Sequence, residues 1–390
     1  MKDKTNAPKG ILHVTKAYFP KLGGVETVVR QLAEGASAEG HRVSVLCCGE
    51  QSAVEEINGV TIHRYQPFLN VGSAPLSFRF MLKLWQLMKQ HDIIHFHVPN
   101  PVGELAFCLS PYKRRVKSLC TYHLDPVRPK SFVRVYKVLL HSFLKCLDVI
   151  CPTSPNYVRS SDILQQHQKS CLPIPLGAEV SRFTEVSSSA LAEAERAVES
   201  LKHPRVLFCG RFSYYKGLSY LLEAIAQVPD ASLILVGRGE KEAELKEQAA
   251  ALGLEGRMLF LDHLPDELYP AIYHTADLFV LPSAYRSEAF GIVSLEAMAA
   301  GLPLVTTELG TGTSFYNVDG ETGFVVPPMD PDALAEAINK LLTDRELASQ
   351  MGLAARKRVD DFDLSRMLRS YLDLYEELLS EATKGDFAGL

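Results

Sequence analysis

The fold is decided by the stretch Asp277-Leu-Phe-Val-Leu-Pro-Ser-Ala-Tyr-Arg-Ser-Glu-Ala-Phe-Gly-Ile-Val-Ser-Leu-Glu-Ala-Met-Ala-Ala-Gly-Leu-Pro303. Its apolar start predicts a buried strand that ends in a polar loop. The loop closes at Gly291, and residues 292–300 have helical composition. Gly301 and Pro303 then end the helix. A strand, a glycine-bearing loop and a helix in this order are typical of one unit of a parallel α/β sheet.

The same pattern recurs on both sides of this stretch. Apolar runs predict strands at residues 11–14, 42–47, 93–97 and 149–151, then at 205–210, 232–237, 259–261, 278–281 and 304–306. Segments of helical composition lie between them, which predicts an α/β fold with two Rossmann-like domains. Such domains bind ligands where the strands end, so we expect the two sheets to face each other across a cleft.

Length and charge support a division into two parts. A chain of 390 residues exceeds the usual size of a single core. We predict an N-terminal domain over residues 1–178, a C-terminal domain over 179–363, and a last helix from about 364 to 390 that packs back on the first domain. Residues 1–178 hold 22 Lys and Arg against 12 Asp and Glu, which gives +10. The other 19 basic and 34 acidic residues give −15, and the sum is the net charge of −5. The first domain therefore suits an anionic partner.

The cysteines and the apolar segments bear on the compartment. The eight cysteines show no Cys-x-x-Cys spacing, and several lie inside apolar runs. Reduced, buried thiols of a cytosolic protein explain this pattern best. The first residues lack the apolar core of a signal peptide, and no apolar segment is long enough to span a bilayer. Attachment to a membrane surface stays open.

Two loops at predicted strand ends carry the groups of a ligand site. Gly210-Arg-Phe-Ser-Tyr-Tyr-Lys-Gly217 places Arg211 and Lys216 after one strand, and these cations suit a diphosphate. Glu288 and Glu296 flank the start of the next helix, where backbone amides favour an anion. Because carboxylates repel a phosphate, the two glutamates call for hydroxyl groups on the same ligand. A nucleotide-diphosphate sugar offers both, whereas solvated loop charges are the simpler alternative.

Three other motifs are less specific. Gly23-Gly24 precedes a helix and would let a ligand approach the backbone, although a plain turn is an equal reading. Gly237-Arg-Gly239 lacks the third glycine of a dinucleotide fingerprint, so we reject that reading. Asp330-Pro-Asp332 resembles a metal-binding D-x-D motif, but Asp330 before Pro331 predicts a helix cap instead. We therefore expect no metal and no cofactor.

Histidines gather at strand ends of the first domain. His95 and His97 lie on one predicted strand, and either a structural or a functional role fits them. His123 and Asp125 follow another apolar run directly. A polar pair at that place has little reason in packing, so His123 has the stronger functional case.

Basic residues concentrate on predicted helices of the first domain. The candidates for a membrane or acceptor surface are Arg114, Arg115, Lys117, Arg128, Lys130, Arg134 and Lys137. A basic amphipathic helix suits anionic lipid or a lipid-diphosphate head group. An ordinary solvated helix face is the alternative. Nucleic acid fits less well, because no aromatic platform accompanies the charges.

Taken together, these motifs resemble the retaining GT-B glycosyltransferases of family 4. The resemblance rests on the early Gly-Gly, on Gly210 to Gly217, on Ser287-Glu-Ala-Phe-Gly-x4-Glu296 and on Gly320 to Pro328. Within that family, His95-Phe-His-Val-Pro-Asn-Pro101, Tyr122 to Arg128 and Glu308 to Ser314 resemble bacterial mannosyl- and rhamnosyltransferases of surface-polysaccharide and lipopolysaccharide biosynthesis.

The resemblance implies a role for each candidate residue. Arg211 and Lys216 would hold the donor diphosphate, Glu288 the hydroxyls of the donor sugar, and Glu296 the ribose. His123 would lie beside the reacting sugar. The implied substrate-binding residues are Gly23, Gly24, Asp125, Gly210, His263, Leu264, Ala289, Phe290, Gly291, Ile292 and Glu296, of which His263 and Leu264 would face the base. Leu124 and Ser314-Phe315 depart from the usual pattern, where relatives often carry Ser and Glu, and this bears on donor identity.

The implied activity is transfer of a hexose, with mannose from GDP-mannose as the best guess, to a lipid-linked or glycan acceptor. We expect it at the cytoplasmic face of the plasma membrane, with the protein bound peripherally. The sequence offers no convincing nucleophile for double displacement, so front-face transfer with retention is the hypothesis. Rhamnosyl or glucosyl transfer, or a nucleotide-sugar epimerase on the same scaffold, are the alternatives.

Overall fold

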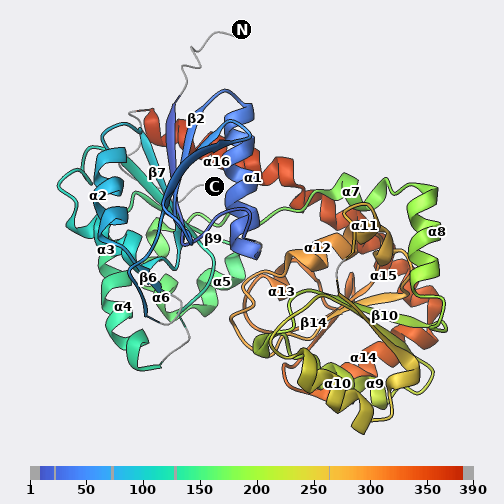
Figure 1. The fold of residues 1–390 in the computed structure, drawn as a ribbon. Helices are drawn as coiled ribbons and strands as arrows, with labels where there is room; N and C mark the ends of the chain where they lie inside the picture. Colours follow the sequence, from blue (N-terminus) through green and yellow to red (C-terminus); the bar gives the residue numbers. More distant parts are fainter. Residues whose placement is uncertain (1–8, 22, 72–73, 127–129, 263, 381–390) are drawn as a thin grey trace. The chain divides into compact units, whose positions relative to one another are not determined.

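A computed structural model describes residues 9–21, 23–71, 74–126, 130–262 and 264–380. It divides into two compact units (Figure 1). Unit 1 comprises the described residues up to Pro175 together with those from Met367 onward, and unit 2 comprises Leu176–Arg366. The described helices do not include one that is both long and apolar enough to cross a membrane.

Unit 1 is built on a seven-stranded sheet of order β3-β4-β2-β1-β7-β8-β9. Its strands are β1 (Gly10–Val14), β2 (Arg42–Cys48), β3 (Ala53–Ile57), β4 (Val60–Tyr65), β7 (Ile93–Val98), β8 (Lys117–Tyr122) and β9 (Val149–Pro152). All neighbours run parallel except β3, which pairs antiparallel with β4. A separate hairpin joins β5 (Leu69–Val71) to β6 (Ala74–Leu76). The central strands are buried along their length, as their continuous apolar runs require.

The helices of unit 1 connect these strands. They are α1 (Gly24–Ala38), α2 (Phe78–Leu87), α3 (Pro101–Leu109), α4 (Lys130–Leu144), α5 (Pro155–Ser160), α6 (Asp162–Gln165) and the short 3-10 helix η1 (Gln168–Ser170). The last helix, α16 (Leu364–Leu379), joins unit 1 from Met367 onward. It buries Tyr371 and Tyr375, one turn apart, against the sheet.

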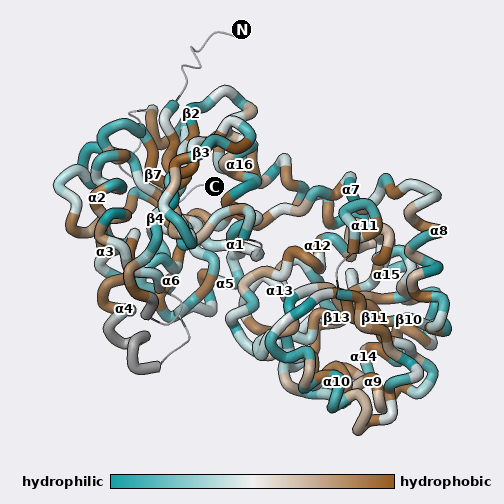
Figure 2. Tube along the Cα trace, in the orientation of Figure 1, coloured by the Kyte–Doolittle hydropathy of each residue, from teal (hydrophilic) through white to brown (hydrophobic). Residues whose placement is uncertain are grey.

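Unit 2 has a six-stranded parallel sheet of order β12-β11-β10-β13-β14-β15. Its strands are β10 (Arg205–Cys209), β11 (Ser232–Val236), β12 (Met258–Leu261), β13 (Leu278–Leu281), β14 (Leu304–Thr307) and β15 (Gly323–Val326). Figure 2 shows hydrophobic residues gathered on β10, β11 and β13. They form the core of this unit, with residues such as Phe208 and Leu235 fully buried.

The helices of unit 2 are mostly short. They are α7 (Val180–Thr184), α8 (Ser188–Ala197), α9 (Leu218–Ala226), α10 (Glu242–Ala251), α11 (Leu268–Tyr273), α12 (Ile292–Ala299), α13 (Thr313–Tyr316), α14 (Pro331–Thr343) and α15 (Arg345–Arg358). Single 3-10 turns occur at η2 (Tyr214–Lys216), η3 (Glu255–Arg257) and η4 (Val359–Phe362). The Asp330 carboxylate accepts a hydrogen bond from the Ala333 amide, which confirms the predicted helix cap.

One device recurs where strands begin. Asp92 lies just before β7; its Oδ2 accepts from the Gly10 amide at 2.7 Å, and its own amide donates to the Gly10 carbonyl at 2.8 Å. Asp148 holds Ser118 in the same way, and Asp277 holds Arg205, each with Oδ2 at 2.7 Å from the amide nitrogen. Each aspartate thus joins the first or second residue of one strand to the start of the neighbouring strand. We call these three residues the strand-entry aspartates.

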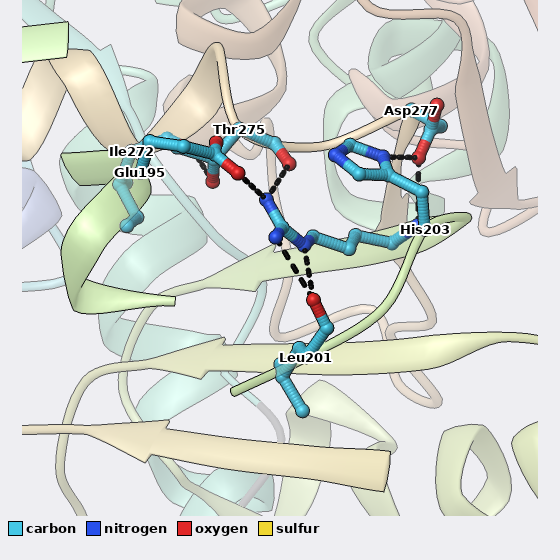
Figure 3. Close-up of polar contacts among 7 residues, drawn as sticks. Glu195, Leu201, His203, Ile272, Thr275 and Asp277 are labelled. Atoms are coloured by element: carbon cyan, nitrogen blue, oxygen red, sulfur yellow. Dashed lines mark hydrogen bonds and ion pairs between the residues drawn. The ribbon is translucent and has the colours of Figure 1, made fainter. Parts of the chain in front are cut away.

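The entry to β10 carries an additional clamp, which Figure 3 shows. The buried Arg205 guanidinium donates to the carbonyls of Leu201 and Thr275 and pairs with Glu195 at 2.6 Å. The His203 ring also contacts Asp277, with Nδ1 2.7 Å from Oδ2. The Arg205 guanidinium therefore stabilises the amino edge of the sheet, away from the strand ends where ligands bind.

The nine strands that the sequence predicts are all confirmed within a residue or two. The helices predicted after Gly24, at residues 292–300 and after Asp330 are confirmed as α1, α12 and α14, and the basic residues Lys130, Arg134 and Lys137 lie on the helix α4. The predicted ranges omitted β3, β4 and the β5–β6 hairpin, where polar residues interrupt the apolar pattern, and they also omitted β8 and the short β15.

Candidate functional site

The candidate site of unit 2 lies where the strand order reverses, between β10 and β13. The chain leaves β10 toward β11 and β12, and returns to the other side of β10 as β13. Loops that follow the two central strands diverge at such a point and leave a crevice at the carboxyl edge of the sheet. The loops here are residues 210–217 and 282–291, the two stretches that the sequence singles out.

A buried ion pair joins these two loops. Lys216 Nζ lies 2.5 Å from Glu288 Oε2, and both side chains are about nine-tenths buried. Burial alone lowers the pKa of the Lys216 ammonium, but the charge of Glu288 and the nearby Tyr215 hydroxyl together raise that pKa above its usual value. Lys216 is therefore a firmly protonated cation inside the protein.

The Glu288 carboxylate is held by one of its two oxygens. Oε2 accepts from both Lys216 and the Ser283 hydroxyl, the latter at 3.1 Å. The Thr311 hydroxyl donates to the Glu288 carbonyl at 2.8 Å, which fixes the backbone as well. No residue in the described ranges donates to Oε1. That oxygen is the one with capacity for a ligand hydroxyl.

Gly217 allows the two loops to approach this closely. Its φ is +68°, and a Cβ atom there would lie 2.1 Å from the Pro282 carbonyl oxygen. The Ala284 amide donates to the Tyr215 carbonyl at 2.8 Å beside it. A side chain at position 217 would push the loops apart and separate Lys216 from Glu288.

Glu296 is held in a similar way from the first turns of α12. Its Oε2 accepts from the Tyr269 and Tyr273 hydroxyls, at 2.7 and 2.6 Å. Burial raises the pKa of the Glu296 carboxyl, and the two tyrosine hydrogen bonds counteract this. Both tyrosines lie one turn apart on α11, so their hydroxyls reach the same oxygen. As in Glu288, the second carboxylate oxygen faces no donor among the described residues.

The other predicted residues of unit 2 surround these groups. Gly210 directly follows β10, Arg211 comes next with an exposed side chain, and Gly291, with φ +84°, directly precedes α12. Ala289 and Ile292 are partly exposed, whereas the Phe290 ring is buried against Tyr316. Leu264 is partly exposed after β12, and His263 lies outside the described residues. Phe290 can therefore serve a ligand only through its backbone.

The corresponding reversal in unit 1 lies between β1 and β7 and carries histidines. His13 Nδ1 is 3.1 Å from His97 Nε2, and His97 Nδ1 is 3.1 Å from His123 Nε2. The His95 ring contacts the Tyr375 hydroxyl at 2.6 Å and the Thr121 hydroxyl at 2.8 Å. All four rings are buried.

Burial keeps these imidazoles uncharged. It lowers the pKa of His13 and of His123 to about 3. It also lowers the pKa of His95 and His97 well below the usual value, with neighbouring histidines adding to the effect. The carboxyl edge of this sheet is therefore lined by neutral hydrogen-bonding rings at pH 7.

Asp125, Gly23 and Gly24 lie around the same edge. Asp125 Oδ1 accepts from the Tyr122 and Ser161 hydroxyls, at 2.9 and 2.7 Å, so it anchors the loop after β8. A Cβ atom on Gly24 would meet nothing within 4 Å, and one on Gly23 would meet only its neighbour Glu26. Protein packing therefore does not explain Gly24, which leaves the approach of a ligand as a reason for it.

The predicted basic surface is only partly described. Arg114 and Arg115 are exposed in the turn before β8, and the half-buried Lys117 begins that strand. Lys137 lies half-buried on α4. Lys130 and Arg134 belong to α4, but only their backbone is described, and Arg128 lies outside the described residues.

The sequence prediction missed several residues of both edges. It did not single out His13, Ser283 or the tyrosine pair Tyr269 and Tyr273. The tyrosine spacing of four on a helix is a readable signal, because it aligns two hydroxyls on one face. His13 has no such signal, since only the strand order brings β1 next to β7.

Two family descriptions match consecutive parts of the chain. "Glycosyltransferase Family 4" matches residues 22–159, and "Glycosyl transferases group 1" matches residues 192–358. The first match falls in unit 1 and the second in unit 2.

Relatives extend this similarity over nearly the whole chain. An O-antigen chain mannosyltransferase C from Escherichia coli is 34% identical over 95% of this chain and 98% of its own. The D-rhamnosyltransferase WbpZ from Pseudomonas aeruginosa is 35% identical over 89% of this chain and 90% of its own. Among solved structures, a sucrose-phosphate synthase from Thermosynechococcus elongatus matches with a TM-score of 0.76 and 25% identity, covering 95% of this chain and 99% of that one.

Proposed function

Since the chain belongs to the GT-B glycosyltransferases of group 1 and family 4, and is therefore a hexosyltransferase, we propose a specific reaction for it. The chain transfers a hexose, with mannose from GDP-mannose as the first choice, to a lipid-linked or glycan acceptor in surface-polysaccharide biosynthesis. It acts at the cytoplasmic face of the membrane and retains the anomeric configuration. The named activities of the mannosyl- and rhamnosyltransferase relatives support the sugar class.

The observation that carries the donor half of the proposal is the Lys216–Glu288 pair at the β10–β13 reversal. An ammonium has three N–H donors, and the pair with Glu288 uses one of them. Lys216 therefore keeps donors for a diphosphate, with Arg211 as its partner. Glu288 Oε1 and Glu296 Oε1 accept from the sugar and ribose hydroxyls at the two ends of one donor.

The reaction follows from this distribution of charge. The bond between the anomeric carbon and the diphosphate oxygen breaks, and the leaving diphosphate gains negative charge that Arg211 and Lys216 stabilise. The acceptor oxygen attacks from the same face and forms the new glycosidic bond. Its proton passes to the departing phosphate. Because the acceptor attacks the face that the diphosphate leaves, the configuration is retained without a covalent sugar–enzyme intermediate.

An exposed apolar surface on unit 1 supports the acceptor half. Phe78 and Leu82 on α2 are 70% and 63% exposed, and Phe68 stacks on Phe78. Leu105 and Leu109 on α3 and Val138 on α4 are exposed as well. Figure 1 shows α2, α3 and α4 along one flank of unit 1. Apolar side chains beside basic residues are what peripheral binding to anionic lipid requires.

A donor screen tests the reaction. GDP-, UDP- and dTDP-sugars are compared by thermal shift, and the best donor is then incubated alone and with membranes. Transfer of labelled sugar to lipid with the α or β configuration of the donor supports the proposal. An isomerised nucleotide-sugar without membranes would favour the epimerase instead, and an inverted product would remove the retaining mechanism.

Flotation with vesicles tests the membrane half separately. We expect Phe78→Ser and Leu82→Ser to weaken binding to vesicles that contain anionic lipid, and reversal of Arg114 and Arg115 to weaken it further at low salt. Leu353→Ser is the matched control, because Leu353 is 70% exposed on α15 of unit 2. Equal flotation of all variants would contradict the membrane assignment.

A further inference from the structure

Three imidazoles in unit 1 form one hydrogen-bonded line across the strand reversal. His13 on β1, His97 on β7 and His123 after β8 are joined by two N–N contacts of 3.1 Å. Each pair of rings has its centroids 5.4 Å apart and its planes within 24° of each other. Hydrogen bonds in the ring planes explain both values. We call these three residues the imidazole line.

The same histidines could suggest a metal site, since ring nitrogens of His13, His95 and His97 lie within 4.8 Å of one another. The ring planes argue against it. The His95 and His97 rings stack with their planes 23° apart, so their lone pairs run side by side and do not converge on one point. In addition, both nitrogens of His95 already contact hydroxyl groups. Hydrogen bonding within the line accounts for the cluster better.

The line has two possible directions because each neutral ring carries one N–H. In the first, His123 Nε2 donates to His97, and His97 donates to His13. His13 Nε2 would then carry the last proton, although this buried atom has no partner among the described residues. In the second direction, His13 donates to His97, and His97 donates to His123. The buried His13 Nε2 then carries a lone pair and no proton.

The second direction costs less. On the protein backbone, a buried N–H without an acceptor is rarer than a carbonyl oxygen with an unused lone pair, and we apply the same order to the imidazole nitrogens. The proton that is absent from His13 Nε2 then appears at the other end of the line, on His123 Nδ1. Among the described residues, none forms a hydrogen bond with that atom, so its N–H is available to a ligand. Burial holds the pKa of the end rings, His13 and His123, at about 3, which agrees with a neutral line.

We propose that His13 and His97 are positioning residues that hold His123 in the tautomer with its proton on Nδ1. His123 then offers an N–H donor, and not a basic lone pair, to an oxygen of the bound sugar. This role of His123 rests on the proposed function. The assignment of the tautomer does not, because it follows from the buried end of the line alone. It also agrees with a mechanism in which the departing phosphate, and not a histidine, takes the acceptor proton.

Nuclear magnetic resonance of the full chain with ¹⁵N-labelled histidine tests the tautomer directly. Long-range proton–nitrogen correlation distinguishes a protonated ring nitrogen from an unprotonated one, and loss of signals in His123→Asn assigns the ring. We expect the His123 proton on Nδ1 at neutral pH. A His123 proton on Nε2 would overturn the proposal, whether or not any sugar is transferred.

Variants at position 97 test the consequence for transfer. The side-chain nitrogen of Asn lies near the position of His Nδ1 and can donate to His123, so His97→Asn should keep the tautomer and most of the turnover. His97→Asp has the same shape but can only accept. It should move the His123 proton to Nε2 and lower kcat about tenfold to a hundredfold, by analogy with the loss seen when the partner that orients a metal-bound histidine is removed.

Controls separate this effect from damage to the fold. Binding of the free nucleoside diphosphate should stay unchanged in both variants, because the groups that we assign to the diphosphate, Arg211 and Lys216, lie in unit 2. His63→Asn and His63→Asp supply the matched pair, since His63 is buried on β4 of the same sheet but is not part of the line. Equal kcat for His97→Asn and His97→Asp, or an equal loss in the His63 pair, would overturn the positioning role. If His97→Asp does not fold, the tautomer of the wild-type chain still decides.

Discussion

The two strand reversals have the same topology, but one holds charged side chains and the other holds neutral ones. In unit 2, the β10–β13 reversal holds an ion pair, Lys216 with Glu288, and a second carboxylate, Glu296. In unit 1, the β1–β7 reversal holds neutral imidazoles that contact each other and the hydroxyls of Thr121 and Tyr375. The Lys216–Glu288 pair and the four imidazoles are all buried. The difference therefore lies in the partners and not in exposure.

Under the proposed function, each strand reversal serves a different task of the transfer reaction. A leaving diphosphate needs fixed positive charge, which survives burial only if a counter-charge such as Glu288 is present. Alignment of a sugar needs directed hydrogen bonds, which neutral rings supply without a counter-charge. The amino edges of both sheets, in contrast, are alike, since strand-entry aspartates close each of them.

Removing one charge of the Lys216–Glu288 pair in unit 2 should have the largest effect on stability and turnover. Lys216→Met leaves Glu288 buried without its cation, and Glu288→Leu leaves Lys216 alone. Each should cost about 3–5 kcal/mol of unfolding free energy. Lys216→Met should also lower turnover by about two to three decades. Denaturant melts and single-turnover assays measure these effects.

The double variant sharpens the same test. Lys216→Met with Glu288→Leu removes both charges, so we expect it to be more stable than either single variant. Lys246→Met is the control, because its pair with Glu242 is exposed and should contribute less than about 1 kcal/mol. Strict additivity of the two single losses would mean that the charges do not interact.

Replacing a strand-entry aspartate at the amino edge of either sheet should have the next largest effect on stability. Asp92→Ala in unit 1 and Asp277→Ala in unit 2 each remove a charged acceptor from a strand amide, of Gly10 and Arg205 respectively. We expect a loss of about 1.5–3 kcal/mol in both cases. Asp230→Ala, in an exposed turn before β11, is the control. A loss in one unit only would show that the aspartates are not equivalent.

Acid should act on the unit 1 reversal through its histidines. The unfolded chain takes up protons below the usual histidine pKa of 6.5, whereas buried His13 does so only near pH 3. The stability that the neutral ring contributes is thus complete above pH 6.5 and is lost as the pH falls. His13→Asn should flatten the pH dependence of unfolding free energy by about 1.4 kcal/mol per pH unit below pH 6.5.

Chemical denaturation at several pH values measures this slope. His274→Asn serves as the control, since His274 is exposed in unit 2. Parallel curves for wild type and His13→Asn would contradict the burial of a neutral ring at that position. A slope that changes equally in both variants would point to a general effect of histidine loss.

Local pattern predicts the elements better than the sites. The buried strands are readable because parallel strands covered on both faces are continuously apolar, as in β10. Arg211, Lys216, Glu288 and Glu296 are readable because they flank predicted strand ends. Their pairing is not, because Lys216 and Glu288 are 72 residues apart and meet only through the order of the strands. His13 and His97, 84 apart, were missed as a pair for the same reason.

The strand-entry aspartate Asp92 sets the register of the side chains at the carboxyl end of β7, the strand that follows it. By pinning β7 to Gly10, it fixes the phase in which His13 lies opposite His95. Because side chains alternate between faces along a strand, a slip by one residue would turn His95 and His97 to the other face of the sheet. A contact at the amino edge of the sheet thus sets the alignment of the rings at its carboxyl edge. A substitution at position 92 should therefore disturb the imidazole line without touching it.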